Sequence, residues 1–134
     1  MERMTPQDIV KTEIERTMPN ADWKAVYAYF HEMVKDPKHR IFRANNTLFI
    51  ITNNGDHTAD VSMCIADPLP IIPKSIKDFG MAMKKCGFTE VRFTSDRVAL
   101  LRLIERAGYK PRVFPGGNIR GTKERPLVKA KVVL

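Results

Sequence analysis

The chain has 134 residues, which is the size of one domain, and we expect residues 1–134 to fold as one. Hydrophobic residues make up 43% and charged residues 28% of the sequence, a balance that excludes a disordered tail, a collagen-like fibre and a disulfide-stapled miniprotein. The net charge of +8 makes an anionic partner a class to consider.

No apolar run approaches the roughly 20 residues that cross a bilayer, and residues 1–10 lack the apolar stretch of a signal peptide. The two cysteines, Cys64 and Cys86, form no CxxC pair and lie in apolar segments. We therefore expect the cysteines to be small buried thiols in a protein of a reducing compartment. Because no apolar run is long enough to cross a bilayer, we expect no membrane partner.

Two helices are expected at the N-terminus. Thr5 can cap the first, and Pro6 suits its first position because that N–H is not needed there. Its apolar stripe recurs every four residues: Val10, Ile14 and Met18. The second is expected to follow an Asn20 cap and to end at Asp36-Pro37. Its apolar positions follow the helical period closely: Trp23, Val26, Tyr27, Phe30, Met33 and Val34.

Three antiparallel strands are expected next, over residues 40–44, 47–52 and 60–66, where β-branched and aromatic residues are frequent. Asn45-Asn46 and the Asn-Gly pair at 54–55 separate them, and Asn-Gly between apolar runs is a hairpin signal. Because Leu48 to Ile51 are all apolar, both faces of the middle strand are expected to be covered.

Residues 67–73 hold three prolines and are not expected to be helix or central strand. A helix is expected from about Lys74 to a Gly87 cap. After it come a strand at 90–94, a helix between an Asp96 cap and Gly108, a short strand at 112–114, a basic connection at 115–126 and a last strand at 127–134. The predicted order is α-α-β-β-β-α-β-α-β-β, an α/β (α+β) class with one mixed sheet between helices.

Positive charge gathers at the C-terminus, where residues 110–134 hold seven basic side chains and one acidic one. The basic residues are Lys110, Arg112, Arg120, Lys123, Arg125, Lys129 and Lys131. Such a cluster is typical of a surface that neutralises phosphates, and it makes a nucleic-acid-binding module one hypothesis. The alternative is a solvated edge hairpin whose lysines discourage the addition of another strand.

The stretch from Phe88 to Tyr109, with the order of elements around it, resembles the GNAT superfamily of CoA-dependent N-acetyltransferases. The resemblance runs from about Arg40 to the end and rests on a strand, the following helix and its Gly108-Tyr109 ending. It implies a mixed, mainly antiparallel sheet flanked by helices. The family's first strand is not visible in this sequence.

The family's catalytic and cofactor-binding signature is missing. The resemblance implies a Gln/Arg-x-x-Gly-x-Gly/Ala loop whose N–H groups hold a pyrophosphate, but residues 67–75 contain no glycine, and prolines remove three donors. The position of the family's frequent general-acid tyrosine is Ile104, and that of a common asparagine is Arg97. Losing the loop's bonds would cost roughly two or three decades of affinity. Any remaining cofactor contact is expected at Lys74 and Ser75.

A weaker likeness is to small GNAT-like proteins encoded among the head and internal-virion genes of short-tailed bacteriophages. It rests on two helix patterns: Ser75 with Phe79, and Arg102, Ile104 and Gly108. It implies a non-catalytic role in head assembly, in the host cytoplasm or the virion, with other virion or assembly proteins as partners.

We therefore expect a GNAT-like assembly or interaction protein with no catalytic residue and no cofactor. His31, His39 and His57 show no ligand spacing, so no metal site is expected. The apolar Leu69, Ile71 and Ile72 are expected to plug the cofactor entrance or to form an interaction surface. The basic residues expected to bind a partner or DNA are Arg120, Lys123, Arg125, Lys129 and Lys131. The alternatives are an acetyl-CoA-dependent N-acetyltransferase with an atypical loop and a basic nucleic-acid-binding module.

Overall fold

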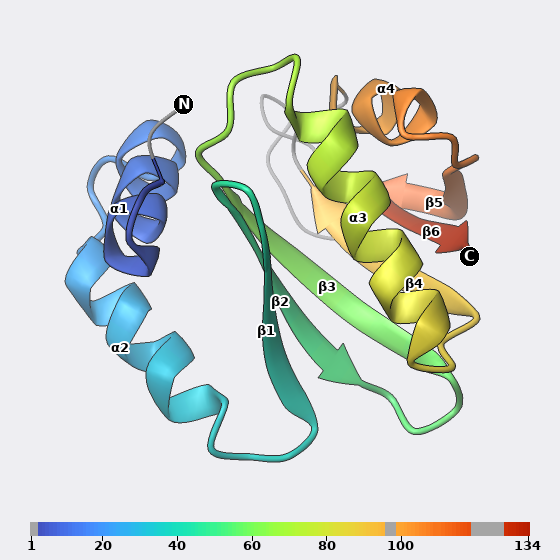
Figure 1. Cartoon of the computed structure of the whole chain (residues 1–134), viewed down its shortest axis with the longest axis horizontal. Helices are drawn as coiled ribbons and strands as arrows, with labels where there is room; N and C mark the ends of the chain where they lie inside the picture. The colour runs from blue at the N-terminus through green and yellow to red at the C-terminus, as the bar shows by residue number, and fades with distance from the viewer. Residues whose placement is uncertain (1–2, 96–98, 119–127) are drawn as a thin grey trace.

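The structure is a computed structural model that describes residues 3–95, 99–118 and 128–134. Its helices and strands follow the predicted order, in one sheet with helices on both faces (Figure 1). They are α1 (Pro6–Thr17), α2 (Trp23–Met33), β1 (His39–Ala44), β2 (Thr47–Asn53), β3 (Thr58–Ile65), α3 (Ile72–Lys85), β4 (Glu90–Ser95), α4 (Ala99–Arg106), β5 (Arg112–Asn118) and β6 (Val128–Val133).

The sheet has the strand order β1-β2-β3-β4-β6-β5. Every neighbouring pair is antiparallel except β3 and β4, which are parallel and are joined through α3. A parallel pair needs such a crossover, because a tight turn can join only antiparallel strands. The predicted α+β class and mixed sheet are confirmed.

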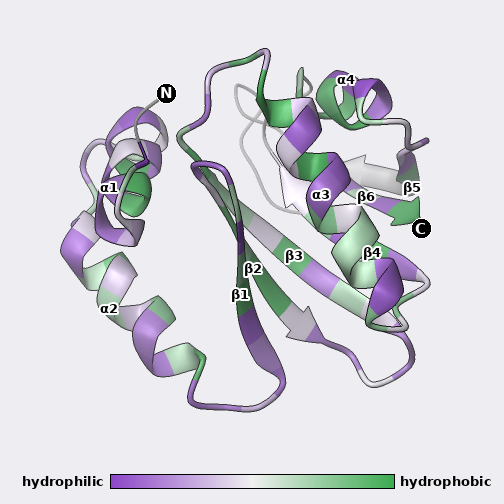
Figure 2. Cartoon of the chain, viewed as in Figure 1, coloured by the Kyte–Doolittle hydropathy of each residue, from purple (hydrophilic) through white to green (hydrophobic). Residues whose placement is uncertain are grey.

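The sheet has a hydrophobic core on each face. Phe49 and Ile51 of β2 face the larger core under α3 and α4, whereas Leu48 and Ile50 face the smaller core under α1. Both faces of β2 are therefore covered, as predicted. Within the larger core, the Phe49 and Phe79 rings stack with their centroids 4.1 Å apart. Figure 2 shows hydrophobic and hydrophilic residues alternating around α1 and α3, which is the pattern of helices that bury one side.

The two N-terminal helices begin with side-chain caps. The Thr5 hydroxyl accepts a hydrogen bond from the Asp8 N–H at 3.1 Å, which confirms the predicted cap of α1. The cap of α2 is Asp22, whose carboxylate accepts from the Lys24 N–H at 3.0 Å. The prediction of Asn20 is wrong because the chain is still in a turn at that residue, and Asp22 accepts from one of the N–H groups that the first turn leaves unpaired.

The helix α3 begins at Ile72, two residues before the predicted start. Pro73 lies in its first turn, where a missing N–H costs nothing, so proline there favours a helix start rather than excluding it. The helix ends at Lys85 with Cys86 at the C-cap, one residue before the predicted cap Gly87, which follows with a φ of +93° that suits a residue without a Cβ.

Three further expectations concern the cysteines, the strand β5 and the basic connection. Cys64 is buried as predicted, but Cys86 is exposed, because it lies at the C-cap of α3, where the chain turns away from the core. The strand β5 extends to Asn118, beyond the predicted end at residue 114. The predicted Asp96 cap, Arg97 and most of the basic connection lie outside the described residues.

Gly80 of α3 lies under the ring of Tyr109, and a Cβ built on Gly80 would lie 2.6 Å from the ring carbon Cζ. We expect Gly80→Ala to destabilise the fold, because the cost of overpacking, about 1–3 kcal/mol, exceeds the helix-propensity gain of alanine. In a Tyr109→Ala background, the sign should reverse, and alanine should stabilise by up to about 1 kcal/mol. Denaturant unfolding of the four proteins tests this. Equal effects of Gly80→Ala in both backgrounds would contradict it.

Candidate functional site: a gap between two parallel strands

The strands β3 and β4 pair at only one end. Their register joins Thr58 to Glu90, Ala59 to Val91 and Asp60 to Arg92, and the described pairing stops there. Beyond it, β3 runs to Ile65 and β4 to Ser95 as the two strands separate. We call the space between residues 61–65 and 93–95 the strand gap. The edge of β3 that faces it has no neighbouring strand in the described chain.

Cavities open the strand gap on both faces of the sheet. One, of about 340 Å³, lies against the starts of α3 and α4 and also reaches α1. The other, of about 350 Å³, lies on the α2 side. Four residues line both cavities: Val61, Ser62, Phe93 and Thr94. Two molecules could therefore approach the same strand edges from opposite faces.

The far end of the gap is held by α1. The Glu13 carboxylate accepts a hydrogen bond from the Ile65 N–H at 3.3 Å, and Arg16 donates to the Ile65 carbonyl at 2.9 Å and also pairs with Glu13. The main chain of Ile65 therefore faces the gap rather than β2. Because these directions alternate along a strand, the N–H and C=O of Met63 face the gap as well.

The start of α3 is tied to the sheet by the buried carboxylate of Asp67. One oxygen accepts from the Asn46 N–H at 2.9 Å, and the other accepts from the hydroxyls of Thr47 at 2.7 Å and Ser75 at 2.8 Å. The Ser75 hydroxyl in turn accepts from the Asn45 side chain at 2.8 Å. Ser75 is fully buried, so its hydroxyl, which was expected to contact a cofactor only if some binding remained, is used inside the fold.

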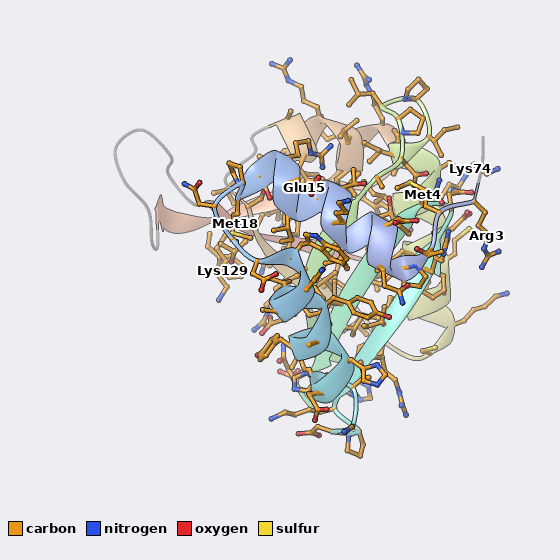
Figure 3. All side chains as sticks on the ribbon, turned by 90° about the vertical axis from the view of Figure 1, so that its left-hand side faces the viewer. Arg3, Met4, Glu15, Met18, Lys74 and Lys129 are labelled. Carbon is orange, nitrogen blue, oxygen red and sulfur yellow. The ribbon has the colours of Figure 1, made fainter. Side chains whose placement is uncertain are left out.

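Positive charge lies near the same end of α3. Lys74 is exposed in the first turn of the helix. Figure 3 shows Arg3 and Lys74 at the same end of the molecule. Burial lowers the pKa of the Arg43 guanidinium, and the neighbouring charge of Arg3 lowers it further. These cations can attract phosphate oxygens even though the loop contains no glycine.

The three apolar loop residues that we expected to act together are separated in the structure. Leu69 is 67% exposed and lines the cavity on the α3 side. Ile72 is buried in the core at the start of α3 and lines the same cavity, whereas Ile71 is half-buried and lines neither cavity of the strand gap. Of the three residues, only Leu69 is exposed at the rim of this cavity, and the strand gap stays open on the α3 side.

The other candidate residues lie in several places. Ile104, at the position of the family's acid, is 4% exposed in the larger core. Lys129 and Lys131 lie on β6, whereas Arg120, Lys123 and Arg125 lie outside the described residues.

The three histidines are on α2, on β1 and in the turn before β3, and no three potential metal ligands gather in the described chain. Among the described helices, none is long and apolar enough to span a membrane.

No protein-family model and no curated protein sequence matches this chain, whereas solved structures of acetyltransferases align with it. A Bacillus subtilis acetyltransferase, solved in complex with CoA, aligns over 100% of this chain and 95% of its own, with 12% identity and a TM-score of 0.59. A spermidine N-acetyltransferase chimera from Vibrio cholerae and a human enzyme aligns over 98% and 94%, with 9% identity and a TM-score of 0.68.

The ribosomal-protein-S18-alanine N-acetyltransferase of Escherichia coli also aligns, over 99% of this chain and 90% of its own, with 11% identity and a TM-score of 0.58. These likenesses extend along nearly the whole of each protein, but the identities are too low to carry an activity. Together with the element order and the separating parallel strands, they show that the chain has the GNAT acetyltransferase fold.

Proposed function

We propose that the chain is an acyl-CoA-dependent N-acyltransferase that holds the pantetheine arm of the cofactor in the strand gap. The open edge of β3 is the observation that carries this proposal. Pantetheine is an extended chain with two amide groups, so it can hydrogen-bond to an unpaired strand edge much as another strand would. The main-chain carbonyl of Met63 can accept a hydrogen bond from one of these amides, and Phe93 and Leu100 supply apolar walls.

The cofactor would supply an acyl group activated as a thioester. The N–H of Met63, on the inner edge of β3, can donate to an oxygen that gains negative charge in the gap. The apolar walls exclude water, which would otherwise compete for the acyl group. The cavity on the α2 side gives an amine access to the same place from the opposite face.

The cofactor's phosphates are expected at the start of α3, held by side chains rather than by a glycine loop. Lys74 is exposed there, and Arg3 and Arg43 lie close enough to each other for their charges to interact. Flexible cations hold phosphate less tightly than a preorganised ring of N–H groups, because their side chains must be ordered on binding. We therefore expect modest affinity for the nucleotide part and a larger share of binding from the arm.

A calorimetric titration with acetyl-CoA and with pantetheine separates these two parts. We expect both ligands to saturate the protein. Lys74→Ala should weaken acetyl-CoA binding about tenfold and leave pantetheine binding unchanged, because only the phosphates contact Lys74. Lys77→Ala, which removes an exposed lysine further along α3, is the matched control and should change neither. Failure of both ligands to saturate the wild-type protein would overturn the proposal.

The second candidate is the non-catalytic assembly role implied by the phage-protein likeness. The buried Ile104 favours it, because an apolar side chain cannot protonate a leaving thiolate. Its expected signature is stable co-purification with a virion or scaffold protein, together with no saturation by acetyl-CoA. Stoichiometric acetylation of an amine with release of free thiol would exclude it.

A further inference from the structure

The half of the sheet formed by β4, β6 and β5 has one face without a helical cover. The helices α1 and α2 pack chiefly over β2 and β3, while α3 and α4 lie on the opposite face (Figure 1). On the open face, Val133 is 61% exposed, and the side chains of Arg92 and Lys131 are about one-third exposed. In Figure 3, Lys129 lies to one side of α2. This face is therefore accessible in the part of the chain that the structure describes.

Three cations face one another across three adjacent strands. The register places Arg92 of β4 opposite Lys131 of β6, and Lys131 opposite Arg112 of β5. Like charges directly opposite each other in a sheet are destabilising. Glu90 offsets part of this repulsion, with Arg92 at 2.7 Å and Lys131 at 3.8 Å. Arg112 forms no ion pair with a described residue.

Lys129 adds a fourth cation to this face, beside an aromatic ring. The ammonium groups of Lys129 and Lys131 lie 5.4 and 5.7 Å from the centre of the Phe114 ring, which holds both on the face. We call Arg92, Arg112, Lys129 and Lys131 the basic face. With Glu90 between them, and with Asp56 and Asp60 close enough to Arg92 to raise its pKa, four positive charges stand beside three carboxylates, and the excess of positive charge lies toward Lys129, Lys131 and Arg112. A fold that concentrates repelling charges on an open surface gains stability when an anion binds there.

The basic face continues into the strand gap. Arg92 and Lys129 also line the cavity on the α2 side, and Asp60 lies at its edge, in register with Arg92. Along this register, Asp60 lies beside the gap, and the positive charges of Arg92, Lys131 and Arg112 follow one, two and three strands away. Since neighbouring strands are about 4.8 Å apart, the positive charges lie roughly 5–14 Å from Asp60. An ammonium group and an anion joined by a short chain match this arrangement.

We propose that the acceptor is an amine that carries a phosphate or carboxylate group, with the anion on the basic face and the amine beside Asp60 at the strand gap. This inference rests on the proposed acyl transfer for the role of the amine, but the binding surface can be tested without it. A polyamine such as spermidine has no anion to place and would be repelled by the four cations. The acceptor of this chain therefore differs in charge class from spermidine, after which the structurally similar Vibrio cholerae enzyme is named.

Nuclear magnetic resonance titration at low ionic strength tests the surface directly, because exposed charges are least screened there. The probes are 4-aminobutyl phosphate and 6-aminohexanoate, each paired with the amino alcohol that lacks the anion, and spermidine. We expect amide shifts at Arg92, Lys129 and Lys131 with both anionic probes, and binding at least about tenfold weaker for the amino alcohols and spermidine. The two anionic probes distinguish a phosphate acceptor from a carboxylate acceptor.

Two substitutions test whether the anion binds on the basic face. Lys131→Gln and Arg112→Gln should each weaken the binding of the phosphate probe about tenfold, whereas Lys77→Gln on α3 should not. Equal binding of the amino alcohols, or tighter binding of spermidine, would overturn the inference. Saturation of the basic face by duplex DNA without saturation by the small anions would also overturn it, in favour of a nucleic-acid interface. Titration of the same sample with acetyl-CoA reports on the strand gap separately, so failure of the proposed function and failure of this inference are distinguishable.

Discussion

Replacing Asp67 by alanine is expected to lower the free energy of unfolding by about 3–5 kcal/mol. The carboxylate is 5% exposed and accepts three hydrogen bonds, from the Asn46 N–H and from the hydroxyls of Thr47 and Ser75. Alanine leaves all three donors without that acceptor in a buried place. Because the same carboxylate ties the first turn of α3 to β2, the start of α3 should also become less protected against hydrogen exchange.

Two other variants separate the role of this network from ordinary surface effects. Asp67→Asn keeps the shape and one acceptor, so it should cost about half as much as alanine. Asp78→Ala removes an exposed carboxylate from the same helix and should change stability by less than about 0.5 kcal/mol. Chemical denaturation of the three proteins gives the comparison. A loss below about 1 kcal/mol for Asp67→Ala would contradict the role assigned to the network.

Filling the strand gap is expected to abolish cofactor binding without unfolding the protein. Thr94 is exposed and lines the cavities on both faces, so tryptophan at this position occupies the space that we assign to the pantetheine arm. We expect Thr94→Trp to weaken acetyl-CoA binding by at least about a hundredfold, because a filled gap cannot admit an extended ligand. Calorimetry measures this, and the thermal midpoint should stay within a few degrees of the wild type.

The matched control places the same side chain outside the gap. Thr12 is exposed on α1 and lines neither cavity, so Thr12→Trp should bind acetyl-CoA as the wild type does. If Thr94→Trp bound the cofactor with unchanged affinity, the ligand would have to lie elsewhere on the protein. That result would refute the location of the site while leaving the fold unaffected.

The element order could be predicted because its signals are local. The apolar stripe of α1, the Thr5 cap and the positive φ of Gly87 each depend on residues within one or two turns. The errors are also local. Asn20 and Asp22 are both good caps, and only the path of the chain decides between them. The run of prolines before α3 predicts a segment without helix, although Pro73 in a first turn favours one.

The strand gap could not be predicted, because it depends on contacts between distant residues. Glu13 reaches the main chain of Ile65, 52 residues away, and nothing around Glu13 distinguishes it from other exposed-looking carboxylates of an amphipathic helix. The separation of β3 and β4 depends on where parallel pairing stops, which no local pattern encodes. For Lys131, the charge is visible in the sequence, but its alignment with Arg92 and Arg112 needs the register of three strands.

The missing glycine loop and the open strand gap lead to opposite expectations about function. Loss of the loop affects only the phosphates, and we put its cost at roughly two or three decades of affinity. The strand gap would hold the arm that carries the reacting group, and its main-chain edge is independent of the residues in the loop. Because the two contributions come from different parts of the ligand, weak nucleotide binding and acyl transfer are compatible.

A crystal structure of the protein grown with acetyl-CoA tests the central claim most directly. We expect electron density for the pantetheine arm between β3 and β4, with at least one amide hydrogen-bonded to the main chain of Met63 and the phosphates beside Lys74. Density for the cofactor at any other place, or an empty strand gap at saturating acetyl-CoA, would contradict it.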